Sequence, residues 1–542
     1  MTSIAWSQHL IILPILLPLL IGAVLAPINE ARHGLKFGIN LLSTATTLAL
    51  ACLLLGLVDN EYWQDGIGVY LAANWAAPFG IALMLDRLAA LMLLLTAIIA
   101  LVALIFSMKR WARIGVHFHS LFQFLLAGLN GAFLTNDLFN LFVFFEVMLA
   151  ASYGLALHGY NVRRIRAGMQ YVIINLIASF LFLIGVALIY ASTGTLNLAD
   201  LGARIPDLEA DKLIFLQIGA TVLALVFLTK SAMWPLGFWL PGIYSAASPP
   251  VAAMLVLMTK VGVYAVLRVW TTAFSPEAGA AAGFGLDALL IGGLMTIVFG
   301  TVGMLASEDG PRMAAFGAII SSGTLLTVIG FGDAALLEVG LYYLLGSTLA
   351  TAAFMLLSEL VDRIKTPGST LLAVTMEAFA IEDKPEEPVG VGIPGSLAFL
   401  GLSFAGCALV ITSMPPLSGF IAKFGMFHAM LDLTPASGTV SALVWTTMAL
   451  LLLSGLAGIV ALMRFGVRSF WVPDDIVAPR LNVSEAMPVL TLLTLCVALT
   501  ILAAPTLDYL NRTVLSLSDP AGQSTRVLGE QPIIRPAMEA NR

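Results

Sequence analysis

Apolar runs long enough to cross a lipid bilayer recur along almost the whole chain of 542 residues. A membrane-spanning helix needs about 20 predominantly apolar residues, because a shorter one does not cross the hydrocarbon layer. Fourteen runs meet this requirement, and they lie near residues 8–27, 35–58, 82–107, 117–135, 137–158, 168–191, 212–244, 249–270, 286–306, 313–331, 336–360, 395–430, 440–465 and 485–505. The runs predict an all-α integral membrane protein with about 14 transmembrane helices.

The composition excludes a water-soluble globular protein. Apolar residues make up 59% of the chain and charged residues 11%, with a mean hydropathy of +0.97, whereas soluble domains carry about 25% charged residues. No polybasic stretch indicates a nucleic-acid partner. The three cysteines lie in apolar runs without metal-ligand spacing, and neither a Walker loop nor a dinucleotide fingerprint is present, so we expect no cofactor or metal.

The basic residues between the runs are unevenly distributed. Loops after odd-numbered runs hold fifteen lysines and arginines, among them Lys36. Loops after even-numbered runs, without the C-terminal tail, hold only Arg204, Lys212 and Arg268. Basic residues concentrate in cytoplasmic loops. The bias therefore predicts that the odd-numbered loops are cytoplasmic and that both termini lie on the extracytoplasmic side.

Four ionisable residues lie inside the predicted spans. Glu146 follows Asp137 by nine residues, which is about 13 Å along a helix and near the middle of a ~30 Å apolar layer. Lys260 lies at a comparable depth, and Lys230 and Lys423 lie in the two longest runs. Such charges usually mark function, although a buried ion pair that only fixes packing is the alternative. Because three lysines face one carboxylate, some lysine is unpaired or neutral, which suits a group that exchanges protons.

Three further ionisable residues are weaker, accessory candidates. Asp137 stands at a helix start, and we interpret it as a helix cap. Asp86 precedes Arg87 near the outer end of its run, and we interpret the two as a local pair. His428 lies five residues beyond the last buried lysine. It is interpreted either as a proton carrier toward the outside or as a satisfied core histidine.

The runs at 212–244 and 395–430 are too long for one straight span. Proline removes an amide donor and clashes with the carbonyl four residues back, so prolines inside these runs predict broken helices. Freed carbonyls are tolerated at membrane depth only against protein or water, so a break beside a buried lysine is a candidate ion or proton site. The candidate helix-breaking residues are Pro235 and Pro241 in the first run, and Pro415 and Pro416 in the second.

The two breaks indicate an internal repeat. They lie about 180 residues apart, each in the fourth run of a block of five, and an odd block length inverts the second block in the membrane. The predicted domains are three N-terminal helices (1–110), a first five-helix repeat (111–275), an inverted second repeat (276–470) with a cytoplasmic insertion (361–393), and a last helix with its tail (471–542).

Four segments together resemble the antiporter-like subunits, a superfamily that covers Mrp antiporters, the proton-pumping subunits of respiratory complex I and membrane-bound hydrogenases. These segments are 139–148, 230–241, 248–264 and 415–424. The resemblance is strongest to the Mrp D subunits. Complex I relatives usually carry an acidic residue and a histidine just after Trp-Leu-Pro, where this chain continues with Gly242-Ile243-Tyr244-Ser245.

The resemblance implies a subunit of a multisubunit Na+(K+)/H+ antiporter in a bacterial cytoplasmic (inner) membrane, a secondary transporter and not an enzyme. Its implied partners are a larger A-type relative and small membrane subunits. Glu146 and Lys230 would form the ion pair of a proton path, Lys260 would relay protons between the halves, and Lys423 would be the terminal site. Two alternatives stay open: a proton-pumping subunit of a complex I or hydrogenase relative, and a scaffold subunit whose charges serve packing.

Overall fold

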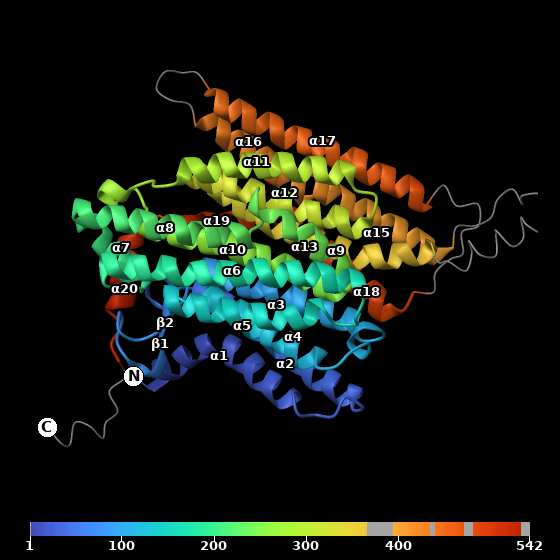
Figure 1. Cartoon of the computed structure of the whole chain (residues 1–542), viewed down its shortest axis with the longest axis horizontal. Helices are drawn as coiled ribbons and strands as arrows, with labels where there is room; N and C mark the ends of the chain where they lie inside the picture. The colour runs from blue at the N-terminus through green and yellow to red at the C-terminus, as the bar shows by residue number, and fades with distance from the viewer. Residues whose placement is uncertain (1, 366–393, 434–439, 471–480, 533–542) are drawn as a thin grey trace, which may run out of the picture.

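The computed structural model describes residues 2–365, 394–433, 440–470 and 481–532, which form a bundle of long helices (Figure 1). The helices are α1 (Thr2–Leu25), α2 (His33–Asp59), α3 (Arg87–Ser107), α4 (Phe118–Leu134), α5 (Leu138–Ala156), α6 (Val162–Thr193), α7 (Leu198–Arg204), α8 (Ala210–Lys230), α9 (Leu240–Ala246), α10 (Pro249–Ala273), α11 (Leu286–Ala306), α12 (Gly310–Phe331), α13 (Ala334–Asp362), α15 (Gly395–Thr412), α16 (Ser418–Asp432), α17 (Ala442–Phe470), α18 (Val483–Ile501), α19 (Ala503–Leu517) and α20 (Pro520–Leu528). Most of the insertion predicted at 361–393 lies outside the described residues.

Thirteen described helices are long and apolar enough to cross a membrane, and α4 is a shorter apolar helix of 17 residues. Every predicted run overlaps at least one of these helices. The run at 212–244 is divided between α8 and α9, and the run at 395–430 between α15 and α16. The chain is therefore a multi-pass membrane protein, as the sequence predicts. The inverted repeat and the domain boundaries stay predictions.

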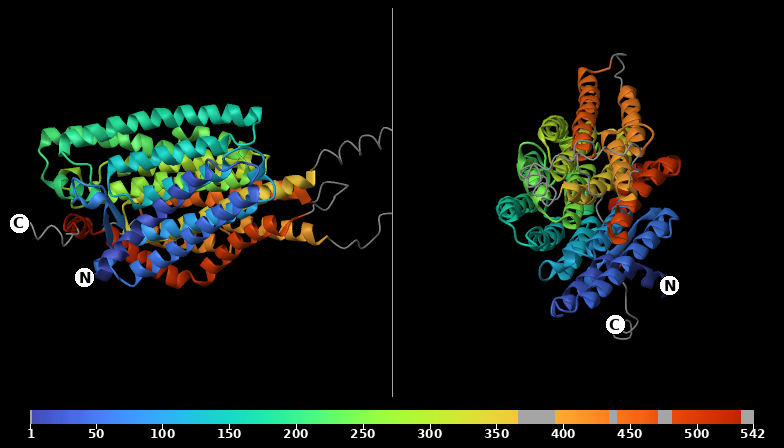
Figure 2. Two further views of the ribbon diagram at one scale, coloured as in Figure 1. Left: turned by 90° about the horizontal axis from the view of Figure 1, so that it is seen from below. Right: turned by 90° about the vertical axis from the view of Figure 1, so that its right-hand side faces the viewer.

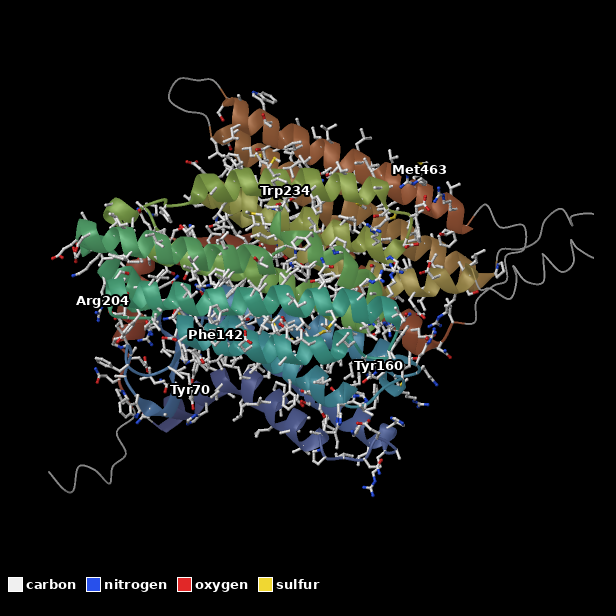
Figure 3. All side chains as sticks on the ribbon, in the orientation of Figure 1. Tyr70, Phe142, Tyr160, Arg204, Trp234 and Met463 are labelled. Carbon is white, nitrogen blue, oxygen red and sulfur yellow. The ribbon has the colours of Figure 1, made fainter. Side chains whose placement is uncertain are left out.

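Viewed along its helices, the bundle has an elongated cross-section, and α10 and α13 are its most buried helices. Seen end on, α1 and α2 lie at one edge and α16 and α17 at the opposite edge (Figure 2). The most apolar stretch of α10 is completely buried, and that of α13 is 94% buried. Large side chains such as Trp234 and Met463, labelled in Figure 3, are exposed on the outside. Buried polar groups on α10 and α13 are thus shielded from lipid by the surrounding helices.

The two ends of the described chain lie together at one end of the bundle (Figure 1). The Gln8 amide donates a hydrogen bond to Glu530 over 2.7 Å. The final amphipathic helices α19 and α20 fold back on the bundle, where Ser524 of α20 donates to the carbonyl of Ala199 at 2.7 Å. An even number of crossings brings both ends to one side, so this contact agrees with fourteen spans.

Three details differ from the predictions. Residues 82–85, predicted as helix, form strand β2 (Ala82–Leu85), which pairs antiparallel with β1 (Gly68–Leu71). The helix begins only after Asp86, whose carboxylate accepts from the Ala89 amide at 2.9 Å. Lys36 and Arg268, both expected in loops, lie inside α2 and α10 and are buried.

Candidate functional site

Glu146 and Lys230 approach the same face of α6 from two neighbouring helices. The Ser179 hydroxyl donates a hydrogen bond to the Glu146 carboxylate, and Lys230 Nζ donates a long hydrogen bond to Asn175 Oδ1 at 3.4 Å. Asn175 and Ser179 are four residues apart, so they project from the same side of α6 one turn apart. Each charge therefore has one neutral polar partner on the same side of α6.

Within the described residues, no direct ion pair joins Glu146 to Lys230. Lys230 is 4% exposed, and its Nζ lies 5.1 Å from the centre of the Phe145 ring, at a distance where a cation is attracted to the aromatic face. Glu146 is only partly buried. The arrangement holds the two charges near each other while α6 supplies the polar contacts of each.

The backbone is interrupted directly after Lys230, the last residue of α8. A short 3-10 helix (Leu236–Trp239) follows, and then α9. The Trp239 indole donates to the Thr229 carbonyl at 3.2 Å, and the Trp234 amide donates to the hydroxyl of Thr296 at 2.9 Å. The Thr296 hydroxyl thus satisfies a backbone amide of the interruption, and the Trp239 indole adds a second donor to a carbonyl that already accepts from the Ala232 amide.

The four prolines predicted to break helices lie at or beside the two interruptions. Pro235 stands immediately before the short 3-10 helix. Pro241 lies in the first turn of α9, where proline is tolerated because no amide is needed there. Pro415 and Pro416 lie between the end of α15 and the start of α16. Each interruption thus lies beside one of the buried lysines, Lys230 or Lys423.

The end of α8 packs tightly against α10 at Gly262. A Cβ atom on Gly262 would lie 2.6 Å from the amide nitrogen of Ser231, closer than real Cβ contacts. Only glycine permits this backbone approach. Gly262 is two residues after Lys260, so the helices that carry Lys230 and Lys260 touch close to both lysines.

Lys260 contacts a row of two buried serine hydroxyl groups, Ser321 and Ser347 (the serine row). The lysine is 1% exposed, and its Nζ donates to Ser321 Oγ of α12 at 2.7 Å. Ser321 Oγ in turn lies 2.9 Å from Ser347 Oγ of α13. A hydroxyl both donates and accepts, so the row can rearrange its hydrogen bonds in either direction.

The row leads toward the second interruption. A Cβ atom on Gly346, the neighbour of Ser347, would lie 3.0 Å from Ser418 Oγ. Ser418 begins α16 and is 1% exposed, and its hydroxyl has no hydrogen-bond partner among the described residues. An unpaired buried hydroxyl keeps its full donor and acceptor capacity. Ser418 therefore lies between the serine row and Lys423 on the same helix.

Lys423 stands at the far end of this series. It is buried, and its Nζ donates to the carbonyl of Leu451 on α17 at 3.2 Å. A Cβ atom on Gly455 would lie 3.4 Å from the same Nζ and 3.1 Å from the Thr412 carbonyl, so the missing side chain leaves room for the amine beside the interruption. In the described part of the chain, Lys423 forms no ion pair.

Two accessory candidates, Asp137 and His428, do not belong to this series. Asp137 caps α5 by accepting from the Asn140 amide at 2.9 Å, as the cap interpretation predicts. His428 is not a core histidine: its side chain is 71% exposed and pairs with Asp432 at 3.1 Å. The core interpretation is wrong because His428 lies on the outward face of α16, which the periodicity around Lys423 alone did not reveal.

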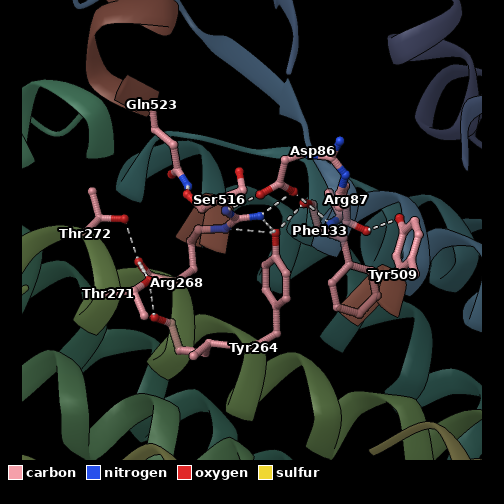
Figure 4. A network of polar contacts seen from close by, with 12 residues as sticks. Asp86, Arg87, Phe133, Tyr264, Arg268, Thr271, Thr272, Tyr509, Ser516 and Gln523 are labelled. Carbon is pink, nitrogen blue, oxygen red and sulfur yellow. Dashed lines mark hydrogen bonds and ion pairs between the residues drawn. The ribbon is translucent and has the colours of Figure 1, made fainter. Parts of the chain in front are cut away.

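Asp86 does not pair with Arg87, so the local-pair interpretation is wrong. Its carboxylate binds Arg268 of α10 through two contacts of 2.6 and 2.7 Å, and both side chains are buried (Figure 4). Arg87 instead donates to Glu61 at 2.9 Å. Tyr264 lies beside Arg268 and accepts from it at 3.0 Å. Asp86 therefore both caps α3, through the Ala89 amide, and pairs with Arg268 of α10.

A second buried cluster lies between α2 and α4, and the sequence analysis did not predict it. Lys36 pairs with Glu30 at 2.7 Å. Burial alone would raise the pKa of the Glu30 carboxyl, but hydrogen bonds from Lys36 and from the His117 amide hold that pKa below its ordinary value. Deeper in the bundle, the Gln123 amide donates to Asn40 at 2.7 Å. The signal was the helical spacing of polar residues at 36, 40, 43, 44 and 47.

The series from Glu146 to Lys423 contains amines, one carboxylate, hydroxyls and an amide, all of which form hydrogen bonds. Of these groups, the amines and the carboxylate also gain and lose a proton. Among the described residues, no group of three His, Cys, Asp or Glu side chains is placed to hold a metal ion.

Comparisons with known proteins identify the family. Residues 135–381 match the family described as "NADH:quinone oxidoreductase/Mrp antiporter, TM". A Rhizobium meliloti protein, named as the probable D subunit of a K(+)/H(+) antiporter, is 50% identical over 96% of this chain and 98% of its own length. The D subunit of an Na(+)/H(+) antiporter from Alkalihalophilus pseudofirmus is 33% identical over 96% and 100%.

Solved structures share the fold. The Mrp complex from Dietzia contains a chain with a TM-score of 0.80 and 24% identity, covering 96% of this chain and 99% of its own. A chain of respiratory complex I from Thermus thermophilus has a TM-score of 0.72 and 22% identity, covering 96% and 100%. With the 50% identical relative spanning nearly its whole length, this chain belongs to the D-subunit family of Mrp-type monovalent cation/proton antiporters.

Proposed function

We propose that this chain is the D subunit of a multisubunit K+ or Na+/proton antiporter, and that it carries protons laterally from Glu146 to Lys423. One observation carries the proposal: polar side chains of neighbouring helices contact Glu146, Lys230 and Lys260, and they lie in the first and the last of the three intervals between Glu146, Lys230, Lys260 and Lys423. Asn175 and Ser179 lie in the first interval, and Ser321 and Ser347 begin the last one. Because the 50% identical relative is named for K+, potassium is the first cation to assay.

In the proposed mechanism, the Lys230 amine alternates between the Glu146 carboxylate of α5 and Asn175 of α6. When Lys230 is protonated, it is attracted toward Glu146 past Ser179, and when it loses the proton it returns to Asn175. The released proton passes to Lys260, whose helix touches the end of α8, and then along the serine row to Lys423. Desolvation makes these steps feasible, because burial disfavours a persistently charged amine.

The proposed setting is a bacterial cytoplasmic membrane with both termini on the extracytoplasmic side. The basic-residue bias of the loops supports this orientation. The proposed partners are a larger A-type relative and small membrane subunits, together with Na+, K+ and H+. Spans 4–8 and 9–13 would be inverted repeats, each with its interruption beside a buried lysine.

The test is antiport by the assembled complex in everted membrane vesicles, measured as cation-induced decay of a pH gradient. Glu146→Gln and Lys230→Ala should each abolish the response to both cations, because each removes one of the two charges that contact the polar groups of α6. Lys212→Ala is the matched control, since that lysine is half exposed and its one ion pair within the described residues is with nearby Glu209. Full activity in either buried-site variant, with normal assembly, would overturn the proton path.

A pull-down of the tagged chain from native membranes tests the assembly. Small membrane subunits and a larger relative should copurify. Stoichiometric redox subunits would instead identify an energy-converting proton pump of the complex I or hydrogenase type. Retained transport after exchange of both Lys230 and Lys423 would identify a scaffold subunit whose charges serve packing.

A further inference from the structure

A cleft of about 670 Å³ opens between α6, α9, α11, α12 and the 3-10 helix before α9. It lies outside the series of buried lysines. Three of its lining residues are arginines, three are phenylalanines and none is acidic: Arg163, Arg166, Arg312, Phe238, Phe299 and Phe316. A cleft with this combination offers separate surfaces to a negative charge and to an apolar chain.

Among the described residues, no acidic side chain pairs with the arginines of the cleft. Arg163 and Arg166 lie in the first turns of α6, and Arg312 lies in the first turn of α12. Helix N-termini carry partial positive charge, so they add to the same potential. Within the described residues, Arg163 donates only to the Ser245 hydroxyl, at 3.3 Å, and none of the three arginines forms an ion pair. Their neighbour Arg164 differs, because it donates to two backbone carbonyls at 2.7 Å.

The apolar wall of the cleft is open and aromatic. Phe238 is 56% exposed, and the Phe299 and Phe316 rings lie edge to face with centroids 5.9 Å apart. At Gly242 on the floor, an added Cβ would meet only the Ala167 Cβ, at 3.9 Å, so space is left above the backbone. This wall suits an extended hydrocarbon chain.

We propose that this cleft binds an anionic phospholipid, with its phosphate on the three arginines and one acyl chain along the three phenylalanines. Guanidinium groups bind phosphate oxygens through paired hydrogen bonds, and basic pockets between transmembrane helices on the cytoplasmic side bind anionic headgroups. The predicted orientation places the start of α6 on that side. The cleft volume is within the range of about 300–1,000 Å³ typical of ligand sites.

The lipid would also brace the first interruption. The cleft wall includes Phe238 and Pro241, which follow the end of α8 at Lys230, while its other side is α12. A lipid held by Arg166 of α6 and Arg312 of α12 therefore spans the interrupted segment. Removing it should loosen that segment and slow antiport, while leaving the residues of the proton series in place.

Native mass spectrometry of the assembled complex tests the binding. Phosphatidylglycerol and phosphatidylcholine with identical chains are the two probes. We expect selective retention of phosphatidylglycerol, and a loss of about two orders of magnitude in its affinity in the triple variant R163Q/R166Q/R312Q, since each basic contact contributes about fivefold. The matched control is R32Q/K109Q/R113Q, which removes three exposed cytoplasmic charges that do not line the cleft. It should bind as the unaltered complex does.

A second variant separates the site from general surface charge. Gly242→Leu keeps all three arginines but fills space inside the cleft, so it should lower the retention of phosphatidylglycerol. In the unaltered complex, added inorganic phosphate should not displace the bound phosphatidylglycerol. Equal retention of both lipids, unchanged binding in the arginine variant, or displacement of the lipid by inorganic phosphate alone would overturn the proposal. Binding to the isolated chain but not to the complex would also overturn it, because a partner subunit would then fill the cleft.

Discussion

Asn175 and Ser179 lie one turn apart on α6, and each contacts one charged side chain: Asn175 accepts from Lys230, and Ser179 donates to Glu146. The amine and the carboxylate therefore each bond to a neutral group of α6 and not to each other. A direct buried ion pair is strongly held, because breaking it leaves an uncompensated charge. In the proposed mechanism, the polar groups of α6 lower that barrier, because each charge keeps a polar partner when the other moves away.

The first prediction concerns Asn175. Asn175→Ala removes the only side-chain oxygen that contacts Lys230 in the described structure. A hydrogen bond to a charged group contributes about 1.5–3 kcal/mol, so we expect antiport to slow by roughly ten- to a hundredfold. The initial rate of cation-induced pH-gradient decay measures this, with the amount of assembled complex as the reference.

Ser192→Ala is the control for Asn175→Ala. Ser192 is also buried on α6, but its hydroxyl bonds to the Ile189 carbonyl of its own helix and to nothing else in the part of the chain that the structure describes. This control should leave the rate unchanged. Equal rates in both variants would show that the Asn175 contact has no part in transport.

The second prediction concerns the serine row. Ser321→Ala and Ser347→Ala should each reduce antiport, because each removes one member of a series that starts at Lys260. The double variant should be no slower than the more severe single variant, since members of one network are not additive. Ser358→Ala is the control, because that hydroxyl bonds within its own helix to Phe354. Strictly additive losses would argue for two independent packing defects.

The third prediction concerns the contact between α8 and α10. Gly262→Ala places a Cβ 2.6 Å from the Ser231 amide, which belongs to backbone and cannot rotate away. Overpacking of this kind costs about 1–3 kcal/mol, so both thermal stability and antiport should fall. Gly401→Ala on α15 meets no atom within 4 Å and serves as the control. A stable, fully active Gly262→Ala variant would show that the helices separate without consequence.

The number of spans and the positions of Glu146 and the three buried lysines within them were predictable from sequence, because hydrocarbon thickness fixes the length of an apolar run and charges inside it are rare. The partners of these charges were not. Ser321 and Ser347 look like ordinary small residues in apolar helices, and only the packing of α12 against α13 brings them to Lys260. Contacts between distant helices have no local signature.

Errors arose where a charge near the end of a run was assigned to water. Lys36 and Arg268 lie within a few turns of a helix end, so hydropathy alone placed them in loops. Each is instead buried against a carboxylate from another segment, Glu30 and Asp86. For Arg268, the partner lies 182 residues away in the chain, and no periodicity connects the two.

The fourth prediction is a pH dependence of stability set by Glu30. Its pKa in the fold lies below the ordinary 4.5 because Lys36 and the His117 amide bind the carboxylate. The carboxylate therefore stabilises the fold fully above about pH 4.5, and this contribution is lost as the pH falls through the lower pKa of the folded state. Glu30→Gln should reduce the unfolding temperature most at neutral pH, with the difference shrinking on acidification. A constant difference at every pH would contradict the assignment.

The fifth prediction concerns the buried pair of Asp86 and Arg268. Asp86→Asn leaves a buried guanidinium without its counter-charge, which costs about 3–5 kcal/mol, so the unfolding temperature of the solubilised protein should fall sharply. The double variant Asp86→Leu with Arg268→Met replaces the pair by apolar groups of similar size and should recover most of that loss, since neither charge is left unpaired. Glu61→Gln is the control. The Glu61 side chain of the Glu61–Arg87 pair is 64% exposed, and exposed pairs contribute about 0–1 kcal/mol. If the double variant were as unstable as Asp86→Asn alone, charge balance would not be what the pair contributes. The pair would then stabilise the fold through its hydrogen bonds, including those that Arg268 donates to the Tyr264 hydroxyl.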